Sequence, residues 1–259
     1  MDRYLRAVPS VADLVHELDQ LLDVERFDDP GVNGLQVPGA AEVSTLVTGV
    51  SANRALLERA AAAGADLVIV HHGLFWRPGM QRVDAVTHGR LRIIFDGGMA
   101  LAAYHLPLDA HREHGNAALL AGALGMTPAT PFAVEHGQPL GWVAIPDREL
   151  TLSELVERTA RATGREPQTY GSGAEHIALA GIVTGGGADY LEAARDAGAQ
   201  ALVTGEVTER SPGLAEELGM HLIAAGHHAT ERFGVRSIGE MLAREHGIAH
   251  TFIDIENSV

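Results

Sequence analysis

The chain has 259 residues, of which 46% are hydrophobic, and its 34 acidic and 19 basic residues give a formal charge of −15. This acidic balance argues against a nucleic-acid-binding protein, because neutralising a phosphate backbone requires a basic face. The chain has no cysteine, which excludes disulfides and thiolate metal sites, and no apolar segment is long enough to span a bilayer. We therefore expect one or two globular domains in a cytoplasmic protein without a membrane partner.

The first part of the chain predicts a helix, a loop and a β-α-β unit. Ser10 can cap a helix whose apolar residues recur at helical spacing over 11–22. The Pro-, Gly- and Asn-rich segment 28–39 predicts a loop, and its simplest interpretation is a connector. Strands are then predicted at 45–50 and 66–70, on either side of an Ala- and Leu-rich helix at 53–63. This alternation predicts a parallel sheet with helices on its faces.

The same alternation continues to the end of the chain. A helix is predicted at 85–95, a third strand at 99–104 and a helix at 115–124, and the segment 127–131, with two prolines, is interpreted as a boundary. The remaining predictions are strands at 140–145, 177–183, 220–224 and 248–255, and helices at 153–162, 211–218 and 238–245. The chain as a whole is therefore predicted to be α/β.

An internal match suggests that one β-α-β unit is used twice. Val47-Thr48-Gly49 matches Val183-Thr184-Gly185, and Gly64-Ala65 matches Gly198-Ala199. In this alignment, His71-His72 falls opposite Gly205-Glu206. The match predicts two similar α/β domains of which only the first carries paired histidines, although α/β composition alone can also produce one such match.

Candidate metal ligands follow three predicted strands, where ligands bind in open α/β sheets. His71 and His72 end the second strand, and His105 and Asp109 follow the third. His227 and Glu231 come after a later strand at a spacing that places both on one helix face. Imidazole and carboxylate suit Zn²⁺, Fe²⁺, Mn²⁺ or Ni²⁺, and a carboxylate such as that of Glu231 can bridge two metal ions. The competing interpretation of each group alone is a solvated or capping role.

Two further motifs do not predict a specific catalytic or binding role. His228 adjoins His227 but points from another helix face, so its role is left open. Gly185-Gly186-Gly187 lacks the Lys-Ser/Thr of a phosphate-binding loop and is interpreted as a tight turn. Covalent acyl transfer has no support, since the chain has neither cysteine nor a Gly-x-Ser-x-Gly elbow.

Five segments carry a resemblance to a known family. They are Asn33–Val37, Val70–Trp76, Tyr104–Asp109, Thr204–Glu206 and Ala225–Arg232. Together they resemble the signatures of the YbgI-like dinuclear metal-centre proteins, which are related to the NGG-interacting factors and are also named GTP cyclohydrolase type 2 homologues. The resemblance covers most of the chain.

The resemblance implies two similar three-layer α/β domains with mainly parallel sheets. Residues 1–128 and 227–259 would form the metal-binding domain, to which the C-terminal segment returns, and residues 129–226 the second domain. It also implies a toroidal homohexamer whose metal sites face an inner cavity.

The resemblance further implies a centre of two divalent metal ions, each of them Zn, Fe, Mn or Ni. By motif match, His72 and Asp109 bind one ion, and His71 and His227 bind the other. Glu231 bridges the two ions. His105 lies beside the centre as a further ligand or a proton-transfer group, so that His105 and Glu231 are the candidate catalytic residues.

The function that this centre suggests is metal-dependent hydrolysis. The favoured hypothesis is an enzyme of the GTP cyclohydrolase type 2 homologue kind, in which a metal-activated water attacks a purine nucleotide. The alternatives are a non-catalytic metal-binding scaffold or interaction protein, and a hydrolase of another substrate such as a phosphoester. A cationic, aromatic-lined pocket would favour the nucleotide, and the side chains near the site motifs that could line one are Arg77, Arg82, Arg232, Phe75 and Trp76.

Overall fold

The computed structural model describes residues 8–79 and 82–259, which fall into two compact units. The first unit extends to Leu108 and resumes at Gly234–Glu256, and the second contains Asp109–Phe233 and Asn257–Val259. Residues 109–128, 227–233 and 257–259, which the family resemblance places in the first domain, lie in the second unit.

The first unit is built on a five-stranded sheet of order β1-β4-β3-β2-β13. Its strands are β1 (Gly34–Val37), β2 (Thr45–Ser51), β3 (Leu67–His72), β4 (Ala100–Ala103) and β13 (Ala249–Phe252). All neighbours are parallel except β1 and β4. Since His72 pairs with Ser51 and Val70 with Ala103, the residues that follow β2, β3 and β4 lie at one edge of the sheet.

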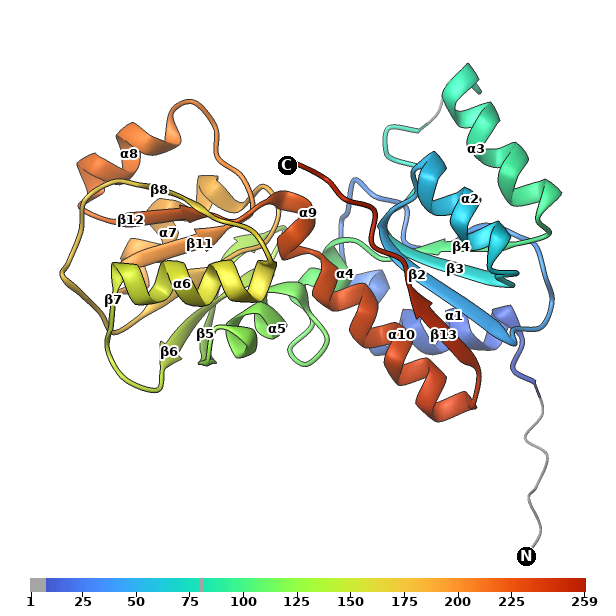
Figure 1. The fold of residues 1–259 in the computed structure, drawn as a ribbon, viewed down its shortest axis with the longest axis horizontal. Coiled ribbons are helices and arrows are strands. Elements are labelled where there is room, and N and C mark those ends of the chain that lie inside the picture. The colour runs from blue at the N-terminus through green and yellow to red at the C-terminus, as the bar shows by residue number, and fades with distance from the viewer. Residues whose placement is uncertain (1–7, 80–81) are drawn as a thin grey trace, which may run out of the picture. The chain divides into compact units, whose positions relative to one another are not determined.

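Helices cover both faces of this sheet (Figure 1). On one face lie α1 (Val11–Leu21) and α10 (Arg232–His246), and on the other lie α2 (Arg54–Ala62) and α3 (Ala85–Asp96). Side chains alternate along β3, so Ile69 packs in the core beneath α1 and α10, whereas Val68 and Val70 pack beneath α2 and α3. A strand buried on both faces is apolar throughout, which is why its sequence shows a continuous run. Two short helices, η1 (Val24–Arg26) and α4 (Leu106–Ala110), follow α1 and β4.

The second unit contains a six-stranded sheet of order β5-β6-β10-β11-β12-β8. Its strands are β5 (Met126–Glu135), β6 (Gln138–Pro146), β8 (Gln168–Tyr170), β10 (Ala180–Ile182), β11 (Ala201–Thr204) and β12 (His221–Ala224). Only β10, β11 and β12 are parallel to one another, and the other three pairings are antiparallel. The α/β class is confirmed, but the prediction of mainly parallel sheets is wrong for this one, because the hairpin β5-β6 and the edge strand β8 extend its parallel centre.

Helices also pack on both faces of the second sheet. Its two cores contain α5 (Asn116–Ala123) and α6 (Leu152–Thr163) on one side, and α7 (Leu191–Asp196) and α8 (Ser211–Leu218) on the other. The remaining elements are β7 (Leu150–Thr151) paired with β9 (His176–Ile177), η2 (Gly187–Tyr190) and α9 (His227–Thr230). Among the described residues, no helix has the length and hydropathy needed to cross a membrane.

Two predicted irregular segments are strands in the structure. β1 lies within the predicted loop 28–39, and β5 includes the predicted boundary 127–131. Both strands lie at an edge of their sheet. Proline is tolerated at an edge, where one side of the strand has no ladder hydrogen bonds to make, and the pairing of β5 is irregular between Pro128 and Thr130.

Tyr104 links the helix α1 to the edge of the sheet at which β4 ends. Its side chain is fully buried, and its hydroxyl donates to Asp19 Oδ1 at 2.9 Å and to the Val15 carbonyl at 3.2 Å. We expect Tyr104→Phe to lower the free energy of unfolding by about 1–2 kcal/mol, because these hydrogen bonds are lost while the ring remains packed. Urea denaturation measures this change. An unaltered unfolding free energy would show that the hydroxyl does not anchor this segment.

Candidate metal centre

Three histidines of the first unit meet at the edge where its parallel strands end. His71 and His72 are the last two residues of β3, and His105 comes two residues after β4. Each offers a ring nitrogen, and these atoms all lie within 4.8 Å of one another. The ring centroids of His71 are 4.7 Å from His72 and 5.1 Å from His105. Three converging imidazoles can hold a divalent metal ion such as zinc.

Hydrogen bonds fix the tautomers of two of these histidines. His71 is fully buried, and its Nδ1 donates to the Tyr104 carbonyl at 2.8 Å. Nδ1 of His105 donates to Asp29 Oδ1 at the same distance of 2.8 Å. Since each Nδ1 carries the proton, Nε2 keeps the lone pair that a metal ion requires. Nδ1 of His72 lies 3.1 Å from the Ser51 hydroxyl, which can donate or accept and leaves this tautomer open.

Asp29 is the buried carboxylate that holds His105. Besides the imidazole, its oxygens accept hydrogen bonds from the backbone N–H of Gly31 and Leu106 and from the Asn33 side chain, at 2.7–2.9 Å. Burial opposes its ionisation, but the hydrogen bonds from His105, Asn33 and Gly31 outweigh it, so the pKa of Asp29 is lowered. Asp29 was not predicted from the sequence. Asp followed by Pro-Gly is a turn pattern in which the Asp side chain accepts a hydrogen bond from the backbone two residues on. This pattern is the sequence signal from which Asp29 could have been found.

The loop after β3 is shaped by Gln36. The Gln36 Oε1 accepts from the Leu74 backbone N–H at 2.7 Å, while its Nε2 donates to the Val32 carbonyl at 2.6 Å. A Cβ at Gly73 would lie 2.3 Å from the Gln36 amide, so this position admits only glycine without rearrangement. The motif segments Asn33–Val37 and Val70–Trp76 are therefore parts of one structure.

Trp76 is the aromatic side chain beside the three histidines. Its ring centroid lies 5.0 Å from that of His105 and 6.0 Å from that of His72, and the residue is 38% exposed. Phe75 instead packs against the core of the first unit. Arg77, one of the side chains that could line a pocket, pairs with Asp28 in an exposed bridge of 3.3 Å.

His227 and Glu231 lie side by side in the second unit. His227 begins α9 and Glu231 follows it, and their Nε2 and Oε2 atoms are 3.2 Å apart. Glu206 is on the other side of the imidazole, with Oε1 3.2 Å from Nδ1 of His227. Glu206 lies two residues after the end of β11. The internal repeat of the sequence aligns it with His72 at the end of β3. Because Glu231 is only 3% exposed, this imidazole and these carboxylates form a partly buried group of metal-ligand atoms.

Glycines make room for this group. Gly185 has a φ of +60°, and a Cβ there would lie 2.1 Å from Glu231 Oε1. The Gly185 N–H donates to the Thr230 hydroxyl at 3.1 Å, so the glycine turn packs directly against the segment that carries His227 and Glu231. The Gly185-Gly186-Gly187 segment thus acts as a tight turn that leaves space for a carboxylate.

Asp109 lies in the second unit and is 8% exposed. Its Oδ1 accepts from the Asn116 side chain at 2.8 Å and from the Thr184 hydroxyl at 3.4 Å. Thr184 immediately precedes the glycine turn, so Asp109 is held beside the end of β10. His228, whose role the sequence leaves open, is also buried, and its backbone N–H donates to the Val259 carbonyl.

The charges in the second unit favour a protonated His227. The hydrogen bond to Glu231 raises its pKa most, burial opposes this, and Glu206 adds to it, so the pKa of His227 is raised to about 9. The resulting stability is present below the ordinary pKa of 6.5 and is lost as the pH rises through about 9. A metal ion must displace this proton, so its binding here strengthens with rising pH.

A match to a family model shows which protein family the chain belongs to. The model described as Duf34/NIF3 (NGG1p interacting factor 3) matches residues 9–258. The chain belongs to the Duf34/NIF3 family. This membership confirms the resemblance seen in the motif segments.

Relatives and solved structures agree with this assignment. Proteins named GTP cyclohydrolase 1 type 2 homolog from Escherichia coli K12 and Pseudomonas aeruginosa are each 41% identical to the chain, covering 93% and 96% of it and 98% of their own lengths. The structure titled protein ybgI, unknown function, is 38% identical with a TM-score of 0.91, and covers 97% of this chain and 100% of its own. TTHA1606 from Thermus thermophilus is 34% identical with a TM-score of 0.88 and the same coverage.

The raised pKa of His227 can be measured in the metal-free protein. We expect its imidazole NMR signals to titrate with a midpoint of about 9, since Glu231 and Glu206 stabilise the imidazolium. Glu231→Gln should move the midpoint down further than Glu206→Gln does, because the hydrogen bond to Glu231 is the larger cause. A native midpoint at or below 6.5 would contradict the charge arrangement described.

Proposed function

We propose that this chain is a metal-dependent hydrolase with a dinuclear centre, acting on a small molecule and most concretely on a purine nucleotide. The observation that carries the proposal is the histidine trio. In His71 and His105, Nδ1 donates a hydrogen bond, buried for His71 and partly buried for His105, so that Nε2 keeps the lone pair that a metal ion requires. Histidines that only pack in a hydrophobic core do not need to bring their ring nitrogens together.

The proposed ligand set follows the family signatures. His72 and Asp109 would hold one divalent ion, His71 and His227 would hold the second, and Glu231 would serve as a ligand of both. The metals are two of Zn, Fe, Mn or Ni, since imidazole and carboxylate suit all four. When bound, such a pair lowers the pKa of a shared water and polarises the substrate.

The protein's own groups would position and exchange protons. His105 is proposed as a further ligand or as the proton-transfer group, because its Nδ1 is anchored on Asp29 and the residue belongs to the histidine cluster. Glu231 is the second proposed catalytic residue, as a bridging carboxylate held in the space left by Gly185. Trp76 supplies an exposed aromatic surface beside His72 and His105 for a planar ring.

An arginine of the second unit supports an anionic substrate. Arg165 packs on Gly226, which precedes His227, and a Cβ at Gly226 would lie 2.5 Å from Arg165 Nη1. This nitrogen is buried and has no hydrogen-bond partner within the described part of the chain. The nucleotide itself is suggested by the relatives named GTP cyclohydrolase 1 type 2 homolog, and a phosphoester fits the same arginine.

The alternative is a metal-binding scaffold without catalysis. The family's description as an NGG1p interacting factor favours this role. In either case we propose that the chain assembles as the toroidal homohexamer implied by the sequence resemblance, which analytical ultracentrifugation tests.

Metal content and formate release test the proposal together. Elemental analysis should find two divalent ions per chain, and about one or fewer in His72→Ala and in Asp109→Ala, since each variant removes a ligand of the same ion. His88→Ala, at an exposed histidine, is the control and should keep the native content. Unchanged stoichiometry in the two ligand variants would overturn the assignment.

The metal-loaded protein should release formate from GTP, and Glu231→Ala should abolish the release because the bridging carboxylate is lost. A screen of phosphoesters under the same conditions tests the other hydrolase. Bound metal without turnover of any of these substrates above a metal-free control would contradict the hydrolase and favour the scaffold.

Asp29→Asn tests the support of His105. We expect metal affinity to fall about 10- to 100-fold, because the variant removes the charge that orients the imidazole. Asp28→Asn is the matched control, since Asp28 is exposed and pairs with Arg77 in the bridge described. Competition with a chromogenic chelator measures both affinities. Equal affinities in the two variants would remove Asp29 from the site.

A further inference from the structure

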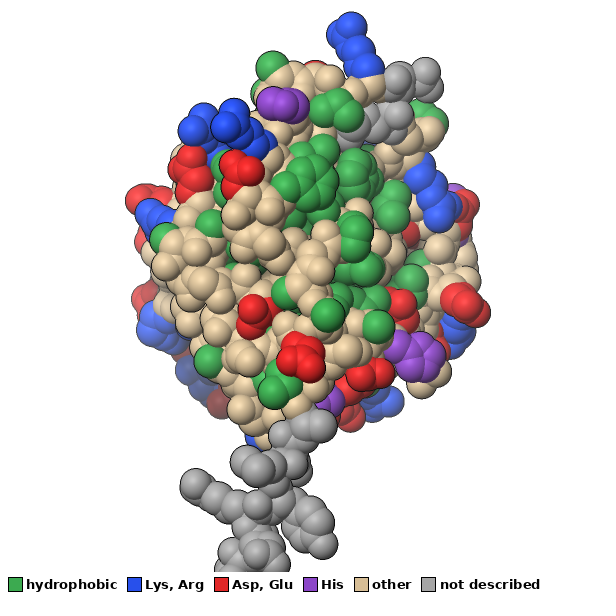
Figure 2. Space-filling model, turned by 90° about the vertical axis from the view of Figure 1, so that its right-hand side faces the viewer, with side chains coloured by type: hydrophobic (Ala, Val, Ile, Leu, Met, Phe, Trp, Pro, Cys, Tyr) green, Lys and Arg blue, Asp and Glu red, His purple; other side chains and the backbone are tan. Residues whose placement is uncertain are grey.

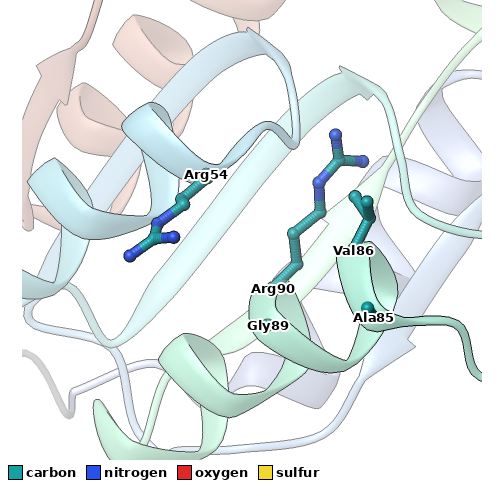
Figure 3. Close-up of a pocket in the computed structure, with 5 residues that line it drawn as sticks. All are labelled: Arg54, Ala85, Val86, Gly89 and Arg90. Carbon is teal, nitrogen blue, oxygen red and sulfur yellow. The ribbon is translucent and has the colours of Figure 1, made fainter.

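The first unit has a pocket that is separate from the candidate metal ligands. It lies between α2 and α3, has a volume of about 290 Å³, and is lined by Arg54, Ala85, Val86, Gly89 and Arg90 (Figure 3). None of these residues is in the histidine trio or among its hydrogen-bond partners. The pocket is therefore not part of the histidine trio or of the groups that hold it.

Arg90 brings an unsatisfied cation to this pocket. Its Nε is buried and has no hydrogen-bond partner among residues 8–79 and 82–259. A buried donor without a partner is costly, and more so when it belongs to a charged group. The described residues that line the pocket include no carboxylate, so an external anion can supply the partner that this donor lacks.

Arg54 adds a second positive charge from the opposite side of the pocket. Figure 3 shows Arg54 coming from α2 and Arg90 from α3. The Arg54 Nε pairs with Glu58 at 2.7 Å, but both side chains are more than half exposed, at 77% and 51%. An exposed pair of this kind is weak, so a bound anion can compete with Glu58 for the guanidinium.

The remaining lining is apolar and open. Val86 is 61% exposed, and Figure 2 shows hydrophobic side chains gathered on the face of the molecule that it views, among scattered charged ones. A Cβ at Gly89 would meet nothing within 4 Å, so this glycine borders open space. Glycine inside a helix costs about 1 kcal/mol relative to alanine, and here no close packing requires it.

We propose that this pocket binds an oxyanion carried on a small apolar group, either a carboxylate or a phosphate monoester. Arg90 donates to the oxyanion, Arg54 adds charge at the opposite wall, and Val86 and Ala85 contact the apolar part. The site is independent of the dinuclear centre, and a guanidinium suits both oxyanions because its fork of N–H groups matches two oxygens.

Side-chain NMR of the ¹⁵N-labelled full chain tests the site, with phenyl phosphate and benzoate as probes. One arginine Nε–H signal should shift saturably, and this signal should be absent from Arg90→Gln. The dissociation constant should rise at least about tenfold in Arg90→Gln, because a charge-assisted hydrogen bond is lost. Gly89→Leu should also weaken binding, since its side chain fills the open space. Preference for one probe identifies the oxyanion.

Arg92→Gln is the matched control. Arg92 lies on the same helix, is 73% exposed and pairs with Asp96, so its loss should leave the affinity unchanged. The titrations are repeated after EDTA treatment, which separates this pocket from anion binding by metal ions. Native affinity in Arg90→Gln, no saturable shift up to about 10 mM of either probe, or binding that disappears with EDTA would each overturn the proposal.

Discussion

Hydrogen bonds to histidine Nδ1 atoms are the interaction on which the candidate metal centre of the first unit depends. The Tyr104 carbonyl holds His71, and the Asp29 carboxylate holds His105. Both acceptors are themselves fixed, one by the end of β4 and the other by a turn that supplies backbone N–H groups. Because Nδ1 of His71 and of His105 carries a proton, Nε2 of each keeps its lone pair before any metal binds, and neither of these two tautomers has to change.

In the second unit, the neighbouring carboxylates determine the protonation of the candidate ligand His227. Glu231 is buried against Gly185, and Glu206 lies on the opposite side of His227, so two carboxylates share one imidazole. Protonation of His227 balances this charge in the metal-free protein, which is why the pKa of His227 rises to about 9. A divalent cation would replace that proton and supply more positive charge. The first unit offers imidazoles, and the second offers an imidazole beside carboxylates. Both kinds of ligand suit borderline divalent metals.

Much of the fold could be predicted from the sequence, and the failures have physical causes. β2 and β3 were predictable because a strand buried on both faces is continuously apolar. β1 and β5 were missed because edge strands tolerate glycine and proline, which otherwise indicate loops. The candidate ligands could be named from the sequence because they follow predicted strands, whereas the internal repeat aligned Glu206 with His72 but left the role of Glu206 open. Asp29 was missed because a buried carboxylate in a turn resembles an ordinary connector, and Arg90 because its lack of a partner is a property of packing, which no local sequence pattern records.

The histidine pair at the end of β3 is central to the proposed function, because we infer that its two imidazoles serve two different metal ions. Anomalous diffraction from crystals of the metal-loaded protein, recorded at the absorption edge of the bound metal, tests this most directly. We predict two peaks about 3.5–4 Å apart, the separation typical of two-metal sites, with one next to each of His71 and His72. A single peak, or peaks that contact neither histidine, would contradict the inference.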